Sequence, residues 1–508
     1  MVDGGRRFHF GYADLAMAGL ALIAFVYTAI RIYSMSITFD EAWAFKYFLE
    51  PRDLSVLKHF FSLFYKDANN HLLNTLLMRL TTWIFGYEEW SLRLPVIGAH
   101  LLFLFFSWQL ARDLDSTMMG IALFVVLNFN PFVLDFFSIA RGYGLAMGLT
   151  AASLWFFARY FRSGCTRSLI RGLWFSSLSV FANLSFLNVY CALLAMYLAR
   201  EIYLYRRQPG PGALWPFIRI RLKGDRNRIA TNLWVTFIIN GIFIARLGHA
   251  GALVHGTDLG FWPSAVGSLI ESTLYGERYA FANVSLLVSV IQVTLIVLVM
   301  ASVACKLAGA SKILDDDTLY LGLLLLCGIS VFLQNVLFSV PYPLDRTTLL
   351  FFPLYVLAIF TGVRALVRCG PKVVRVVCVA FLALLTAATA AHAARTMNLD
   401  STYLWRYDEE SEAIMRQIAR DARGLTGDGP LVINIDREWR FQSSFNYYLF
   451  LLGLNDFAEV VRVRELPDPG ATYIVMDQGM IKSDIGPLIE VAKWKKQPLT
   501  VMRRPAPD

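Results

Sequence analysis

The stretch SITFDEAWAF, residues 36–45, places two adjacent carboxylates, Asp40 and Glu41, directly after the first long apolar segment, residues 14–33. A segment of about twenty mostly apolar residues is long enough to cross a bilayer as a helix. The carboxylate pair therefore lies where the chain leaves a membrane. Charged groups at that depth are costly unless they face a polar cavity, a metal ion or a charged partner. This stretch is the first candidate for chemistry.

The composition is that of a polytopic membrane protein, because 56% of the 508 residues are hydrophobic and 17% are charged. A soluble protein would carry about a quarter charged residues. The formal net charge is +9, but the basic residues gather in short loops between apolar segments, as the positive-inside rule predicts. We therefore expect no nucleic-acid partner. The six cysteines show no CxxC spacing and no disulfide framework.

Eleven segments are apolar and long enough to be membrane-spanning helices. They cover residues 14–33, 92–111, 118–138, 141–160, 170–186, 187–205, 231–248, 282–304, 318–340, 347–366 and 374–394. The fifth and sixth segments form one apolar tract, and a single helix there would invert the topology downstream. Eleven spans with a cytoplasmic N-terminus place the basic clusters inside. The sequence thus predicts a multi-pass protein of the inner (plasma) membrane with an extracytoplasmic C-terminus.

The chain divides into a membrane domain, residues 1–395, and a C-terminal domain, residues 396–508, where the hydropathy falls. The first extracytoplasmic loop, residues 34–91, carries most of the polar candidates. The C-terminal domain is predicted to be a small extracytoplasmic α/β domain. Its pattern indicates helices at residues 411–422 and 441–452 and strands at residues 431–435 and 473–476.

Asp40 and Glu41 have two compatible interpretations. In the first, a carboxylate at the membrane face is a general base that deprotonates an acceptor hydroxyl, or a ligand of a hard divalent cation. In the second, Thr38 or Asp40 caps a helix that starts near Glu41. Asp135 adds a second carboxylate in the short outer turn between the third and fourth spans. Its alternative role is a salt bridge with Arg141, six residues further on.

His71 follows two asparagines and precedes an amphipathic segment, residues 72–85, that suits a helix lying in the membrane interface. It is a candidate to bind a metal or substrate, although a histidine at a helix start is also an ordinary cap. Arg346, at the outer end of the tenth span, is suited to hold a phosphate or to anchor the interface. Further candidates for substrate binding on the outer side are Asn70, Arg93, Arg141, Tyr143 and Arg278.

Four short motifs occur in a characteristic order along the first 160 residues. They are the pair Asp40-Glu41 after the first span, the motif around His71 before the interfacial helix, Arg93-Leu94-Pro95 in the second span and Ala140-Arg141-Gly142-Tyr143 at the fourth. With the eleven-span frame and the outer C-terminal domain, this set resembles the GT-C membrane glycosyltransferases of the protein O-mannosyltransferase and lipid A aminoarabinose transferase superfamily. The bacterial galacturonosyltransferase-like members look most similar.

The resemblance implies the GT-C fold, a sugar donor linked to polyprenyl phosphate, and an extracytoplasmic glycan, lipid or protein as acceptor. By position, Asp40 matches the family's catalytic acid, Glu41 its neighbour and Asp135 the second-loop carboxylate, while Arg346 fits the donor phosphate. A divalent cation is a candidate cofactor, with Asp40, Asp135 and His71 as candidate ligands. A nucleotide cofactor is not expected, because a lipid-phosphate donor needs none. Where relatives often carry proline after the histidine, this chain has Leu72.

A second class of protein shares many of these features. A polytopic lipid or sugar transporter, or a flippase without transferase activity, also has many spans and buried charges. Transporters of this kind commonly show internal repeats and paired broken helices, and the sequence shows neither. That class also leaves the long first outer loop and the C-terminal domain without a role, so the sequence favours the glycosyltransferase.

Overall fold

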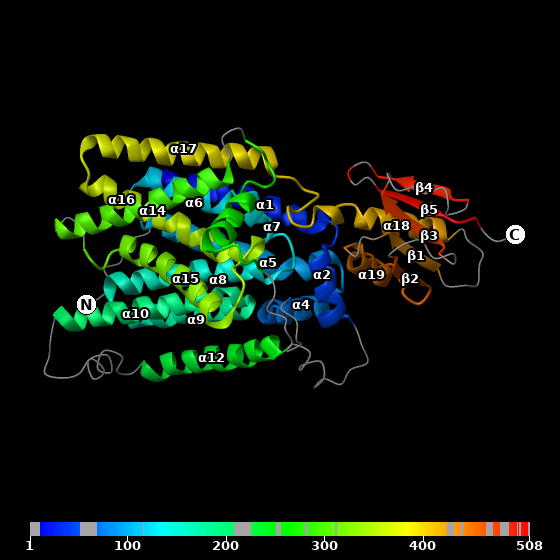
Figure 1. Ribbon diagram of the computed structural model, residues 1–508, viewed down its shortest axis with the longest axis horizontal. Helices are drawn as coiled ribbons and strands as arrows, with labels where there is room; N and C mark the ends of the chain where they lie inside the picture. The colour runs from blue at the N-terminus through cyan, green and yellow to red at the C-terminus, as the bar shows by residue number, and fades with distance from the viewer. Residues whose placement is uncertain are drawn as a thin grey trace.

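The structure is a computed structural model in which long helices run side by side and a small sheet lies beyond one end of them (Figure 1). The described residues are 11–50, 69–114, 116–207, 225–249, 256–279, 283–309, 312–423, 431–436, 440–463, 471–477, 487–494, 496 and 499–505. The predicted first outer loop, residues 34–91, is therefore described at its two ends.

A helix occupies each of the eleven positions predicted to span the membrane. These helices are α1 (Tyr12–Ser34), α5 (Glu89–Arg112), α6 (Thr117–Asn128), α8 (Gly142–Ser163), α9 (Thr166–Ala182), α10 (Leu187–Arg207), α12 (Arg226–His249), α14 (Val284–Leu307), α15 (Asp316–Phe338), α16 (Phe352–Cys369) and α17 (Lys372–Thr396). Within the described ranges, eight helices are long and apolar enough to cross a membrane. The positions of the other three predicted spans are occupied by α6, α8 and α9.

The tract over the fifth and sixth predicted spans is two helices, as the charge distribution indicated. Helix α9 ends at Ala182, and a short 3-10 turn, η3 (Leu184–Phe186), precedes α10. The Asn183 side chain accepts a hydrogen bond from the Ser185 N–H at 3.0 Å. Because such a cap satisfies an N–H group that has no partner within the following turn, the sequence breaks the tract at Asn183.

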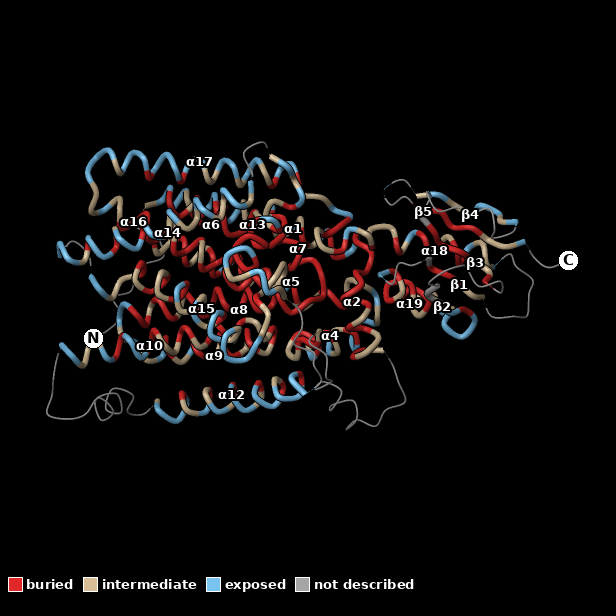
Figure 2. The backbone as a smooth tube through the Cα atoms, viewed as in Figure 1, coloured by how far each residue is buried: buried red, intermediate tan, exposed pale blue. Residues whose placement is uncertain are grey.

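The interfacial helix predicted over residues 72–85 is α4 (Leu72–Phe85). Its buried face is mostly polar and includes Asn74, Thr75 and Thr82, while the apolar Leu80 and Trp83 are exposed. This distribution is the reverse of a soluble amphipathic helix and suits contact with lipid. Figure 2 shows how burial varies across the bundle: α5 and α8 are largely buried, and the outer faces of α12 and α17 are exposed.

The C-terminal part is a small α/β domain, as predicted. Its elements are η6 (Arg406–Asp408), α18 (Ser411–Ala422), β1 (Leu431–Asp436), α19 (Phe441–Leu451), β2 (Ala458–Val463), β3 (Tyr473–Asp477), β4 (Ile489–Lys493) and β5 (Leu499–Arg503). The strand order is β2-β1-β3-β5-β4. Strand β1 is parallel to β2 and β3, whereas β5 is antiparallel to β3 and β4. The two predicted helices and two predicted strands are present, and three further strands complete the sheet.

The C-terminal domain packs directly on the segment that carries Asp40. That segment folds as α2 (Phe39–Ala44), followed by a π-helical turn, η1 (Phe45–Leu49). Phe45 and Phe48 share one buried apolar cluster with residues of α18 and α19. The rings of Phe45 and Tyr447 meet edge to face, with centroids 5.1 Å apart. The segment that carries Asp40 thus packs against α18 and α19 of the C-terminal domain.

Candidate active site

Helix α2 begins with a capping box in which Glu41 reaches back to Thr38. The Thr38 N–H and hydroxyl both donate to Glu41 Oε2, at 2.9 and 3.0 Å. Such a box satisfies donors that a helix start otherwise leaves without partners. The predicted cap is therefore present, with Thr38 as the N-cap and the helix starting at Phe39. Asp40 is left free of the capping role.

Glu41 is also paired with Arg93, and neither side chain is exposed to solvent. Arg93 Nε lies 2.8 Å from Glu41 Oε1 and Nη2 lies 2.9 Å from Oε2, so the pair is bidentate. The Ala140 N–H donates to Oε1 at 2.6 Å. Burial opposes the charged carboxylate, but Arg93 outweighs it and holds the pKa of Glu41 below its usual value. A bidentate, fully hydrogen-bonded pair is the arrangement in which a buried charge is stable.

The remaining donors of Arg93 bind backbone carbonyls near the end of α1. Nη1 donates to Ile32 at 3.2 Å and to Met35 at 2.8 Å, and Nη2 donates to Ser36 at 2.9 Å. With the two bonds to Glu41, all five N–H donors of the guanidinium are used. Arg93 was predicted to bind substrate, and the structure places it inside the protein, where it joins α1, α2 and α5.

Asp40 is in a different electrostatic environment from its neighbour Glu41. Its Oδ2 atom lies 3.4 Å from Arg141 Nη2 and 3.4 Å from Arg346 Nη2. Charge-assisted hydrogen bonds are usually about 2.7–2.9 Å long, so both contacts are loose. Oδ2 is buried and accepts no hydrogen bond from the residues that the structure describes. Asp40 therefore combines burial, two nearby cations and an unused acceptor.

The two arginines next to Asp40 are positioned by different parts of the chain. Arg141 is the N-cap residue of α8, and its Nη2 donates to Asn69 Oδ1 at 2.9 Å. Arg346 lies in the 3-10 turn η5 (Asp345–Phe351) before α16. Its guanidinium carbon lies 5.4 Å from the centre of the Trp405 ring, a cation–π contact that orients the planar group. The predicted candidates from three separate spans thus meet at one carboxylate.

His71 lies beside the same group of residues. Its ring packs edge to face on Tyr143, with centroids 5.2 Å apart, and its Nδ1 lies 3.4 Å from Asn183 Nδ2. Burial, with Arg141 and Arg346 nearby, holds the pKa of His71 well below its usual value. His71 is therefore a neutral group here and adds no positive charge to the site.

Two local features place the His71 ring. A Cβ atom at Gly142 would overlap both the His71 side chain and the Ala182 carbonyl oxygen, so only glycine allows α8 to approach this closely. Asn70 Oδ1 accepts a hydrogen bond from the Thr75 hydroxyl at 3.1 Å. Asn70, a predicted substrate-binding residue, thus holds the start of α4.

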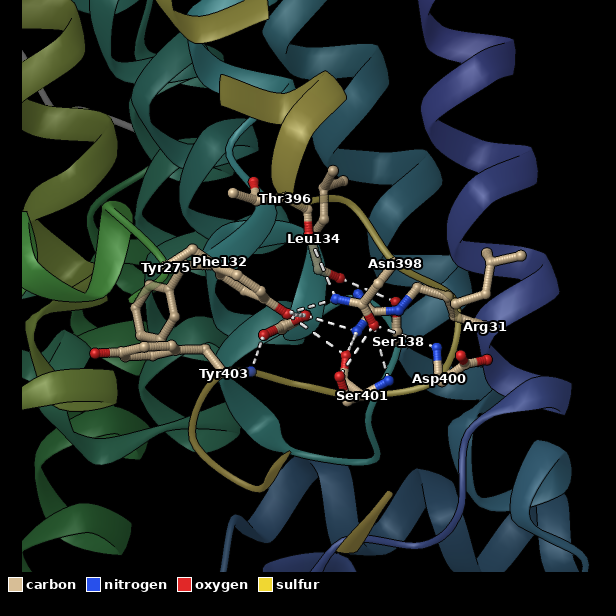
Figure 3. Close-up of polar contacts among 12 residues, drawn as sticks. Arg31, Phe132, Leu134, Ser138, Tyr275, Thr396, Asn398, Asp400, Ser401 and Tyr403 are labelled. Atoms are coloured by element: carbon tan, nitrogen blue, oxygen red, sulfur yellow. Dashed lines mark hydrogen bonds and ion pairs between the residues drawn. The ribbon is translucent and has the colours of Figure 1, made fainter. Parts of the chain in front are cut away.

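Asp135 belongs to a second network, whose other members Arg31, Tyr275, Ser401 and Tyr403 are labelled in Figure 3. Asp135 Oδ1 lies 2.7 Å from Arg31 Nη2 and accepts from the Tyr275 hydroxyl at 3.1 Å. Its Oδ2 accepts from the Tyr403 N–H at 2.9 Å. The alternative role predicted for Asp135, a salt bridge with Arg141, is therefore wrong. Asp135 lies at the end of the short helix α7 (Pro131–Asp135) and pairs with α1, whereas Arg141 pairs with α2.

The three predicted metal ligands do not gather in one place. Asp135 is engaged by Arg31, and Asp40 lies between two guanidinium groups, whose charge disfavours a cation. In the part of the chain that the structure describes, no three histidine, cysteine or acidic side chains could hold a metal ion. The residues present therefore do not fit the predicted metal.

Arg278, which was predicted to bind substrate, is exposed in the segment after α13 (Ser268–Thr273).

The structure adds residues that the sequence did not indicate. Trp405 contacts Arg346, and Asp408 contacts the start of α2, although both follow the last predicted span. Asn183 contacts His71 from a position inside an apolar tract. Asn183 was detectable as a polar residue in a membrane segment. Trp405 and Asp408 lie in a segment with no pattern of its own that would connect them to Asp40.

No family model and no curated protein matches the sequence. Among solved structures, the chain is similar to ArnT from Cupriavidus metallidurans bound to undecaprenyl phosphate. The two sequences are 12% identical, the match covers 96% of this chain and 97% of that chain, and the TM-score is 0.47. The apo state of the same protein gives the same identity and coverage and a TM-score of 0.49.

A third similar structure is arabinosyltransferase EmbB from Mycobacterium smegmatis, with 11% identity, 89% of this chain and 44% of that chain covered, and a TM-score of 0.42. ArnT and EmbB are membrane glycosyltransferases of the GT-C fold, the class that the sequence motifs resemble. Identities of 11 and 12% assign no residue role in this chain.

Proposed function

We propose that this chain is an integral membrane glycosyltransferase that transfers a sugar from a polyprenyl-phosphate donor to an extracytoplasmic glycan, lipid or protein. The observation that carries the proposal is the state of Asp40 Oδ2, which is buried, lies 3.4 Å from two arginines and accepts no hydrogen bond from the described residues. A buried carboxylate with an unused acceptor is costly. A buried polar group without a partner in a native structure calls for an explanation, and a catalytic role is one such explanation.

Asp40 is proposed to be the general base. It takes the proton of an acceptor hydroxyl, and the resulting oxygen attacks the anomeric carbon of the donor sugar. The new carbon–oxygen bond forms as the bond to the phosphate oxygen breaks, and the electron pair leaves with polyprenyl phosphate. A single displacement of this kind inverts the anomeric carbon. Positioned proton transfer of this type accelerates a reaction by roughly 10² to 10⁴.

Arg141 and Arg346 are proposed to hold the donor phosphate and stabilise its charge as the sugar leaves. Arginine presents a planar fork that matches two phosphate oxygens. Their contacts with Asp40 are loose, so a phosphate can take part of their hydrogen-bonding capacity while Asp40 turns to the acceptor hydroxyl. Electrostatic stabilisation of developing negative charge is usually a large contribution to catalysis. The ArnT complex contains undecaprenyl phosphate, a ligand of the donor class proposed here.

The other predicted site residues are proposed to support this centre. Glu41 and Arg93 have their polar atoms occupied by one another and by the backbone. Asp135 is occupied by Arg31 and two hydrogen bonds. We therefore assign Glu41, Arg93 and Asp135 to holding the framework. His71 and Tyr143, whose rings pack edge to face, are proposed to line the phosphate position.

The test compares cells that lack the gene with cells that carry it. Loss of one sugar from an envelope glycan, lipid or protein, together with accumulation of a polyprenyl-phosphate sugar, is expected and would name both substrates. Wild-type protein should restore the product and Asp40→Asn should not. A matched control is Asp421→Asn, which makes the same substitution in the C-terminal domain. The partners of Asp421 are Tyr473 and Arg503, at 2.8 and 2.9 Å, and not the residues of the proposed site. Full restoration by Asp40→Asn would refute the role of Asp40 as the base, and an unchanged set of envelope sugars in cells that lack the gene would refute the transferase.

A further inference from the structure

The start of α2 is held from two sides, and Asp40 lies between the two attachments. On the membrane-domain side, Glu41 is fixed by Arg93 and by the Ala140 N–H. On the C-terminal side, the Phe39 N–H donates to Asp408 Oδ2 at 2.6 Å. Phe39 and Glu41 are the immediate neighbours of Asp40 in the chain. The position of the Asp40 carboxylate therefore depends on both attachments.

Asp408 is a buried carboxylate that is held by hydrogen bonds. Its relative exposure is 1%, and no ion pair of Asp408 occurs among the described residues. Its Oδ1 accepts from the Ser444 hydroxyl at 2.6 Å and from the Ser411 hydroxyl at 3.2 Å. Removing a carboxylate from water without a cation is expensive, even when hydrogen bonds compensate in part. An apolar residue would pack here at lower cost, so we infer that the carboxylate of Asp408 is needed as a hydrogen-bond acceptor.

Neighbouring contacts make the same connection. The Ile37 N–H donates to the Tyr448 hydroxyl at 2.8 Å, and the Ser36 hydroxyl donates to the Glu409 carbonyl at 2.9 Å. Asp408 differs from these because it binds the first residue of α2 itself, where the N–H has no partner within the helix. Among these contacts, Asp408 acts most directly on the helix that carries Asp40.

We propose that Asp408 is a positioning residue for Asp40, so that the C-terminal domain completes the active site in addition to any part it has in acceptor recognition. This inference rests on the proposed role of Asp40 as the base. Without the bond from Phe39, the first turn of α2 is free to shift relative to Arg141 and Arg346. A displacement of about 1 Å in a catalytic group can lower a rate by roughly 10²-fold. Donor binding should change little, because Asp408 touches neither arginine in the described contacts.

The experiment compares full-length Asp408→Ala and Asp408→Asn with wild type, Asp40→Asn and the control Asp421→Asn. Membranes of the deletion strain supply donor and acceptor, and undecaprenyl phosphate is the binding probe. Asp408→Ala should lower kcat by about tenfold to hundredfold, with the Kd for undecaprenyl phosphate within about twofold of wild type. Asp408→Asn should regain most of kcat, because the amide oxygen still accepts from Phe39. Asp421→Asn should match wild type.

The outcomes separate this inference from the proposed function. If Asp40→Asn is inactive and Asp408→Ala retains wild-type kcat, the positioning role is refuted and the proposed function stands. If Asp40→Asn is active, the proposed role of Asp40 as the base fails, and this inference fails with it. Equal losses in the Asn and Ala variants of Asp408 would also refute positioning through the Phe39 bond. Should Asp408→Ala yield no folded protein, Ser444→Ala replaces it, with an expected fall in kcat of a few fold and unchanged probe binding; unchanged kcat would refute the role.

Discussion

Two carboxylate sites lie in the membrane domain near the C-terminal domain, and they differ in how fully their oxygens are used. Asp135 lies 2.7 Å from Arg31 and accepts two further hydrogen bonds. Asp40 is nearly as buried, with relative exposures of 4% for Asp40 and 2% for Asp135, yet its cations lie 3.4 Å away and Oδ2 accepts no hydrogen bond from described residues. Burial and nearby positive charge are therefore alike at the two sites, and the unused acceptor is what distinguishes Asp40 from Asp135.

The difference has a physical basis in what each site must accomplish. The Asp135 carboxylate is stable because Arg31 neutralises its charge and both of its oxygens accept hydrogen bonds. A site that must take a proton and release a phosphate cannot be saturated beforehand, because its groups need to change partners during the reaction. The Asp135 site is therefore expected to respond to mutation in stability, and the Asp40 site in turnover.

The sharpest test of this contrast is Asp40→Asn. The amide keeps the size of the side chain and removes the base, so transfer activity should fall by roughly 10² to 10⁴. The thermal midpoint should stay near that of wild type, because Thr38 and Glu41, and not Asp40, form the cap of α2. Both quantities are measured on purified, monodisperse protein. Near-normal turnover in this variant would remove Asp40 from the chemistry.

The same substitution at the other carboxylate, Asp135→Asn, should have the opposite effects on stability and turnover. It leaves Arg31 buried without its counter-charge, and breaking a buried ion pair typically costs about 3–5 kcal/mol. We expect a clear fall in the thermal midpoint and in the yield of folded protein. Turnover per folded molecule should fall by less than it does for Asp40→Asn. If Asp135→Asn were stable and inactive, Asp135 would replace Asp40 as the candidate base.

Substitutions at Arg346 test the proposed role of the arginines that lie 3.4 Å from Asp40. Arg346→Ala should weaken donor use by about tenfold or more, since a hydrogen bond to a charged group contributes about 1.5–3 kcal/mol. Arg346→Lys should lie between Ala and wild type, because lysine keeps a point charge and loses the fork and the contact with Trp405. Initial rates at several donor concentrations distinguish these cases. Wild-type kinetics in both variants would make Arg346 an interfacial anchor.

The last prediction concerns the pH dependence of stability. Burial raises the pKa of Asp408 from its ordinary value of 3.8 to about 8, against the hydrogen bonds from Ser444, Phe39 and Ser411. A raised pKa means that folding favours the protonated form, so this contribution to stability is complete below pH 3.8 and is lost as the pH rises through about 8. The thermal midpoint of wild type should therefore fall relative to that of Asp408→Asn over this range. Parallel midpoints for the two proteins would contradict this prediction.

Much of the molecule was determined by the sequence alone. The positions of eleven helices, the interfacial helix α4, and two helices and two strands of the C-terminal domain were predicted from apolar runs, periodicity and charge. These features depend on residues close together in the chain, so local patterns suffice to indicate them. Asp40, His71, Arg141 and Arg346 were also identified as candidates, because polar residues next to apolar segments are unusual.

The tertiary structure alone decided which of these residues share a site. It paired Asp135 with Arg31 where the sequence suggested Arg141, and it thereby separated Asp135 from the other two predicted metal ligands, Asp40 and His71. It also brought Asp408 to Phe39 across 369 residues. Contacts of such separation depend on how helices pack and on where the chain returns after its last span. No local pattern encodes them, since the residues involved look the same in sequence whether their partners are near or far.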